Sequence, residues 1–124
     1  MSNSTESIHR LRMEEGNDRI LKVACNILRT LLVLGGAGWK DELADGLTAI
    51  AAEQNDSGSI ASRDEVENAL NILGEKDLID HKKGKRTDPS GTSTIEDHVY
   101  SLKDHIATSQ VFGADKAVMI LRGR

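Results

Sequence analysis

The sequence predicts a mainly α-helical fold with one small β-hairpin. Apolar side chains recur at spacings of three and four residues in three segments between residues 18 and 73, which is the period of helices buried along one face. After residue 77, two extended segments flank a loop rich in turn-forming residues, a pattern typical of a hairpin. The length of 124 residues suits one small domain.

The first strong helix is expected from about Asp18 to Leu34. Before it, residues 1–16 form a polar segment with room for a short helix. The glycine-rich segment 35–38 ends the strong helix, because glycine supplies the positive φ that often follows a last turn. One apolar stripe marks its buried face: Ile20, Val23, Ala24, Ile27, Leu31 and Leu34.

A second helix is expected over residues 39–54, and Gly46 inside it predicts a bend or a break. The composition of segment 55–59 indicates a loop. A third helix begins at Ser62, which forms a capping-box signature with Glu65 because each side chain can reach the other residue's backbone amide. Its apolar positions follow helical spacing: Val66, Ala69, Leu70 and Leu73.

The predicted hairpin starts at Leu78, and residues 94–102 return as its second strand. The loop between the strands, residues 87–92, contains the one proline of the chain. The C-terminal extension, residues 103–124, is expected to contain a helix from about Ala114.

Composition and charge limit the classes of function. A net charge of −4 excludes a uniformly basic surface but allows a local basic patch. Aromatic residues make up 2% of the chain, which disfavours single-stranded nucleic-acid binding by base stacking. Cys25 is the single cysteine, so no intrachain disulfide can form and a cytoplasmic location fits. The longest apolar run, residues 31–34, is too short to cross a membrane.

No pattern in the sequence indicates catalysis or a cofactor. The glycines at 35–38 lack the following Lys-Ser or Lys-Thr of a phosphate-binding loop. His81 and His98 are expected to meet across the hairpin, but the Asp beside each one points to the opposite face of its strand, which disfavours a metal site. Cys25 is expected to be a buried apolar residue rather than a redox thiol. We therefore expect no enzyme, no cofactor and no metal.

The segment His81–Arg86 is strongly basic. Such a run forms either a solvated loop or a set of phosphate contacts, and its position on a hairpin favours phosphate contacts. Four cations lie in these six residues: Lys82, Lys83, Lys85 and Arg86.

The order of expected elements resembles a known domain. Over residues 17–102, two helices, a capped helix, a strand, a basic loop and a returning strand follow one another. This order is similar to the winged helix-turn-helix domain of small bacterial and archaeal transcriptional regulators, with a three-helix core, a wing and extra terminal segments. The pieces that carry the resemblance are 26–32, 41–44, the helix from Ser62, 78–79 and 99–102.

The resemblance implies binding to double-stranded DNA. The helix from Ser62 would be the recognition helix in the major groove, and the hairpin would be the wing on the neighbouring backbone. Carried over by position, Arg63, Asn68 and Asn71 would contact bases. The wing cations Lys82, Lys83, Lys85 and Arg86 would contact phosphates.

The resemblance also implies a homodimer, because such regulators usually bind two half-sites, and residues 103–124 are the expected dimerisation segment. Glu67 departs from the pattern, since a carboxylate on the recognition helix repels DNA. The alternative is therefore a winged-helix module that docks a protein partner within a larger assembly. A third option is a small-ligand or redox sensor on the same scaffold, which an apolar cavity beside the first helix or an exposed Cys25 would favour.

Overall fold

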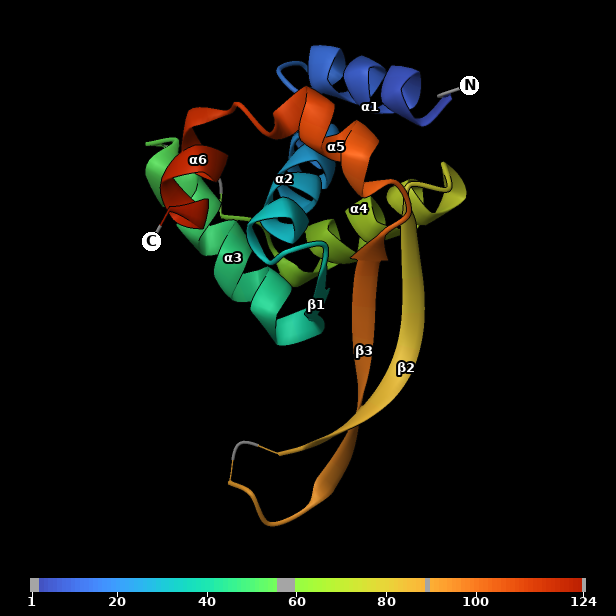
Figure 1. The fold of residues 1–124 in the computed structure, drawn as a ribbon, viewed down its shortest axis with the longest axis vertical. Helices are drawn as coiled ribbons and strands as arrows, with labels where there is room; N and C mark the ends of the chain where they lie inside the picture. Colours follow the sequence, from blue (N-terminus) through green and yellow to red (C-terminus); the bar gives the residue numbers. More distant parts are fainter. Residues whose placement is uncertain (1–2, 56–59, 89, 124) are drawn as a thin grey trace.

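The computed structural model describes residues 3–55, 60–88 and 90–123. These ranges contain six helices and three strands, and the β-hairpin projects from the helical body (Figure 1). None of the helices within them has the length and apolar character needed to span a bilayer. The elements are α1 (Asn3–Glu14), α2 (Arg19–Val33), β1 (Ala37–Trp39), α3 (Lys40–Glu53), α4 (Arg63–Glu75), β2 (Ile79–Thr87), β3 (Thr94–Leu102), α5 (His105–Phe112) and α6 (Lys116–Arg122).

Helix α2 is the central element of the core. It contacts α1, α3, α4, α5 and α6, and its residues 23–32 are all buried. The Asp18 carboxylate caps it by accepting from the amides of Ile20 and Leu21 at 2.9 and 3.2 Å. The predicted helix and its glycine terminator are confirmed, with φ of 88° at Gly35 just after the last turn. Cys25 is fully buried as predicted, and burial raises the pKa of its thiol to about 12.

Helix α4 begins as the sequence predicts. The Ser62 hydroxyl accepts from the Glu65 amide at 3.2 Å, and the Glu65 carboxylate accepts from the Ser62 amide at 2.9 Å. This reciprocal pair is the predicted capping box. The helix buries Ala69, Leu70 and Leu73 against α2 and leaves its opposite face to solvent.

Helix α3 runs without interruption through Gly46, so the chain does not break there. The glycine serves a close approach between helices instead. A Cβ atom at this position would clash with the Cγ2 methyl of Thr30 on α2. The predicted loop that follows α3 lies, apart from Asn55, outside the described residues.

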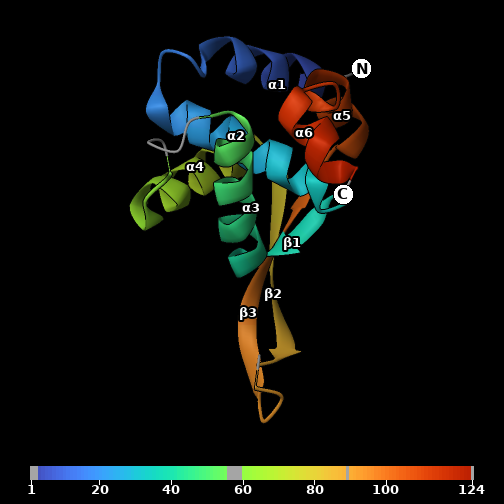
Figure 2. The same ribbon diagram turned by 90° about the vertical axis from the view of Figure 1, so that its left-hand side faces the viewer.

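The three strands form one antiparallel sheet in the order β1–β3–β2. β1 lies beside β3 with Gly38 opposite Tyr100, and β2 pairs with β3 from Ile79 opposite Leu102 to the far end of the hairpin (Figure 2). The two hairpin strands are confirmed, but the expected basic loop is wrong, because His81–Arg86 lies within β2 and pairs with β3. Pro89 lies outside the described residues. β1 was not predicted, because a three-residue strand shows no measurable period.

The terminal segments pack on the core and on each other. Helix α1 starts at Asn3, contacts α5, and buries Ile8 and Leu11. Helix α5 was not predicted, and α6 lies close to the expected C-terminal helix.

A buried polar cluster joins these terminal helices to α2. Arg29 is 4% exposed, and its guanidinium donates to both Glu15 oxygens at 2.7 Å, to Asp115 at 2.8 Å and to Asn26 at 2.8 Å. The guanidinium carbon also lies 4.6 Å from the centre of the Phe112 ring. Burial lowers the pKa of Arg29, but the bonds to Glu15 and Asp115 outweigh it and raise the pKa above its usual value.

Candidate nucleic-acid interface

The solvent face of α4 carries the three residues predicted to contact bases. Arg63, Asn68 and Asn71 are all exposed. At about 100° of rotation per residue, Arg63 and Asn68 lie about 140° apart around the helix, with Asn71 between them. The three side chains therefore span one broad face rather than converging on a point.

Glu67 lies within this face, about 40° around the helix from both Arg63 and Asn71. It has an ionic partner that the sequence did not reveal. Its carboxylate pairs with the ammonium of Lys40 at the start of α3. The Lys40 hydrogen bond lowers the pKa of Glu67, so this carboxylate stays charged and is neutralised within the chain. Asp64 and Glu75 are the exposed carboxylates of α4 that form no ion pair within the part of the chain that the structure describes.

Strand pairing divides the cations of β2 between the two faces of the hairpin. Residues directly opposite each other in an antiparallel pair share a face. Lys83 and Lys85 therefore share a face with His98 and Glu96, whereas Lys82 and Arg86 lie on the other face. His81 and Tyr100, on the first face, line a groove with Glu67 and Asn71, so this face is turned toward α4.

Arg86 is held against the base of α3. Its guanidinium donates to Asp41 at 2.6 Å, pairs with Asp97 at 3.0 Å, and lies 5.0 Å from the centre of the Trp39 ring. The hydrogen bond from Arg86 lowers the pKa of Asp41. Arg86 is predicted to contact phosphate, and in the structure its guanidinium also has these intrachain partners.

The three lysines differ from Arg86. Lys82, Lys83 and Lys85 are exposed, and no carboxylate among the described residues lies within ion-pair distance of their ammonium groups. Their charges are therefore available to an external anion.

His81 and His98 meet across the hairpin as expected. His81 Nε2 lies 2.7 Å from His98 Nδ1, and the His81 ring stacks on both His98 and Tyr100 with centroid distances of 4.8 Å. Burial and the charge of His98 lower the pKa of His81. Among the residues that the structure describes, no three His, Cys, Asp or Glu side chains gather as they would around a metal ion.

Lys40, Asp41 and Trp39 shape this interface, and sequence reasoning did not single them out. They contact α4 and the hairpin across 27 to 47 residues of chain, a separation that leaves no local signal. Comparisons with protein-family models, with curated proteins and with solved structures found no match to this chain.

Proposed function

We propose that this chain is a winged-helix protein that binds double-stranded DNA, as a transcriptional regulator in the cytoplasm. Helix α4 would enter the major groove and the β2–β3 hairpin would follow the adjacent phosphates. The proposal is supported by the order of elements, in which α2, α3 and α4 precede the hairpin and β1 pairs with β3.

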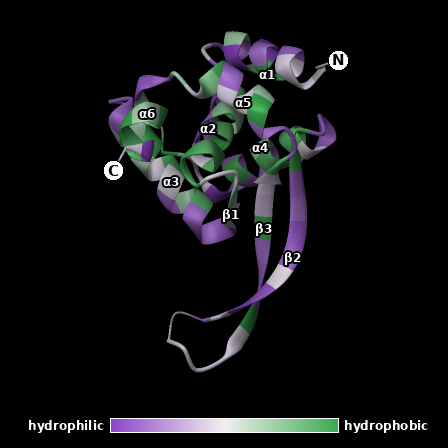
Figure 3. Cartoon of the chain, viewed as in Figure 1, coloured by the Kyte–Doolittle hydropathy of each residue, from purple (hydrophilic) through white to green (hydrophobic). Residues whose placement is uncertain are grey.

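The observation that carries the proposal is the availability of the lysines on a projecting hairpin. Lys82, Lys83 and Lys85 have no carboxylate partner among the described residues, and β2 is largely hydrophilic (Figure 3). Lysines in such a position neutralise phosphates and release counterions, which is the main source of affinity in sequence-independent binding. Because they lie on both faces of the hairpin, the hairpin would sit along a groove edge with phosphates on either side.

Base contacts would come from the exposed face of α4. Arg63 can donate two hydrogen bonds to guanine, and Asn68 or Asn71 can pair with adenine. The Lys40–Glu67 pair supports this role, because it compensates the charge of one carboxylate on this face. Asp64 and Glu75, on the same face, form no ion pair among the described residues.

The proposal is tested by fluorescence anisotropy of a labelled duplex over a salt series. Each phosphate contact contributes about 0.9 to the slope of log affinity against log salt, so replacing three lysines by alanine lowers the slope by about 2.7. The matched control removes three exposed cations elsewhere: Arg10, Lys116 and Arg122. We expect the control to retain the slope. No duplex affinity at low salt, or equal slopes for both triple variants, would refute the proposal.

A protein-interaction module is the second candidate. It is favoured by the exposed carboxylates Asp64 and Glu75 on α4 and by the net charge of −4. This candidate predicts no duplex affinity at low salt. It also predicts recovery of a defined protein from native extract on the immobilised chain, with loss of that protein when α4 carries Asp64→Asn and Glu75→Gln.

Homodimer formation belongs to the same proposal. The helices outside the three-helix core expose Met13, Ile106 and Met119 on α1, α5 and α6. Sedimentation equilibrium tests it, since a dimer would have twice the 13.5 kDa mass of the chain and a monomer at all concentrations would exclude it.

A further inference from the structure

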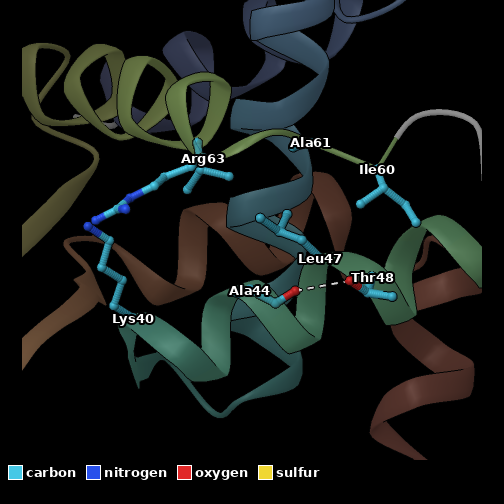
Figure 4. Close-up of a pocket in the computed structure, with 8 residues that line it drawn as sticks. Lys40, Ala44, Leu47, Thr48, Ile60, Ala61 and Arg63 are labelled. Carbon is cyan, nitrogen blue, oxygen red and sulfur yellow. Dashed lines mark hydrogen bonds between the residues drawn. The ribbon is translucent and has the colours of Figure 1, made fainter.

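An apolar groove of about 280 Å³ lies between α3 and the start of α4 (Figure 4). Its volume is close to the lower end of the range of about 300–1,000 Å³ that small-molecule sites occupy. Ile60 lies along it and is 55% exposed. The apolar lining consists of Ala44, Leu47, Ile60, Ala61 and Val66.

Two cations stand at one end of this groove. The side chains of Lys40 and Arg63 reach toward the same end, while Ile60 lies at the other (Figure 4). Lys40 is paired with Glu67, whereas Arg63 has no carboxylate within ion-pair distance among the described residues. The three groups together carry one net positive charge, so the end of the groove is complementary to a single negative charge.

We propose that this groove binds a small amphipathic monoanion, with its apolar body on the aliphatic lining and its anionic head on Arg63. A guanidinium can hold a carboxylate through two parallel hydrogen bonds, which gives orientation as well as affinity. One water molecule occupies about 30 Å³ in the liquid. A groove of this volume therefore accommodates about nine non-hydrogen atoms of that size. A medium-chain fatty acid has this size and chemistry.

The site does not include the hairpin lysines, and the groove beside His81 has other lining residues, although Glu67 of that groove pairs with Lys40 and Arg63 is also a proposed base contact. The proposal therefore goes beyond DNA binding, and its test uses no nucleic acid. Failure of duplex binding would leave the outcome of the ligand test unaffected.

The experiment titrates the isotope-labelled full chain with octanoate and records amide chemical shifts. Octanol, which has the same apolar body without the charge, is the matched ligand. We expect octanoate to bind about ten-fold more tightly than octanol, because a charge-assisted hydrogen bond is worth about one power of ten in affinity. The shifts should concentrate at Ala44, Thr48, Ala61 and Val66.

Three variants separate the parts of the proposal. Arg63→Gln should remove the preference for octanoate over octanol, and Glu67→Gln should strengthen octanoate binding several-fold by freeing Lys40. Ala44→Phe adds a ring at an exposed position and should block both ligands without unfolding the chain. Lys116→Gln, on α6 and outside the groove, is the control for loss of one charge.

The proposal is overturned if octanoate binds no more tightly than octanol. It is also overturned if the shifts map outside the groove, or if Arg63→Gln and Lys116→Gln reduce octanoate binding equally. Absence of shifts at millimolar octanoate would have the same consequence.

Discussion

The buried Arg29 cluster allows a stability effect to be worked out from the structure. In Arg29→Met the aliphatic stem is replaced by a side chain of similar length that still packs on Phe112, while all charge is lost. Four hydrogen bonds disappear, two to Glu15, one to Asp115 and one to Asn26. The two carboxylates that remain are each only 14% exposed.

The size of the stability loss depends on the two carboxylates that remain buried after Arg29 is replaced. Removing one partner of a buried ion pair costs about 3–5 kcal/mol, because the other charge is left without compensation. Arg12 still contacts Asp115 at 2.7 Å and Lys22 lies 4.0 Å from Glu15, so the lower end of that range, about 3 kcal/mol, is expected. For a chain of this size the loss corresponds to a decrease in Tm of about 10 °C.

Urea and thermal unfolding, followed by circular dichroism, measure this loss. Arg12→Met is the matched comparison, because the Arg12 side chain is 37% exposed and a partly solvated pair contributes about 1 kcal/mol or less. In the triple variant Arg29→Met, Glu15→Gln and Asp115→Asn, most of the lost stability should return, since no charge remains buried. A loss for Arg29→Met no larger than for Arg12→Met would refute the reasoning.

Three further predictions concern α3, the histidine pair and the base of the hairpin. Gly46→Ala should destabilise the fold by about 1–3 kcal/mol through overpacking against Thr30. In a double-mutant cycle, Thr30→Ser should restore part of that loss, and strictly additive effects of the two changes would exclude the contact. The pKa of His81 in the folded chain lies below its usual value of 6.5, so as the pH falls the unfolded chain binds a proton at His81 before the folded chain does. The free energy of unfolding should therefore be highest above pH 6.5 and decline as the pH falls from 6.5 toward the pKa of the folded state. The charges that face His81 are His98, Lys83, Glu67 and Lys40; His81→Phe keeps the stacking and should flatten this decline in urea titrations, and an unchanged decline would contradict the assignment. Arg86→Gln should shift the fluorescence of Trp39, the one tryptophan of the chain. It should also lower the salt slope of duplex binding less than replacement of any single hairpin lysine does. A larger loss of slope for Arg86→Gln than for a lysine variant would show that Arg86 contacts phosphate.

The sequence determined by itself those elements whose signals are local. Helix α2 was predictable because its apolar stripe repeats with the helical period, and α4 because its capping box needs only residues within one turn. The hairpin strands followed from turn-forming residues between two extended segments. The exposure of Arg63, Asn68 and Asn71 was predictable in the same way, since the buried stripe leaves only one face to solvent.

Only the tertiary structure decided which charges remain available. Glu67 meets Lys40 and Arg86 meets Asp41 across 27 and 45 residues, so their neutralisation depends on how α3 packs against α4 and the hairpin. The short strand β1 exists because β3 offers an edge to pair with. Gly46 lies inside a helix because the close approach of Thr30 leaves no room for a Cβ atom there. Periodicity and caps are properties of neighbouring residues, whereas ion pairs, helix contacts and grooves depend on distances that arise only when the chain has folded.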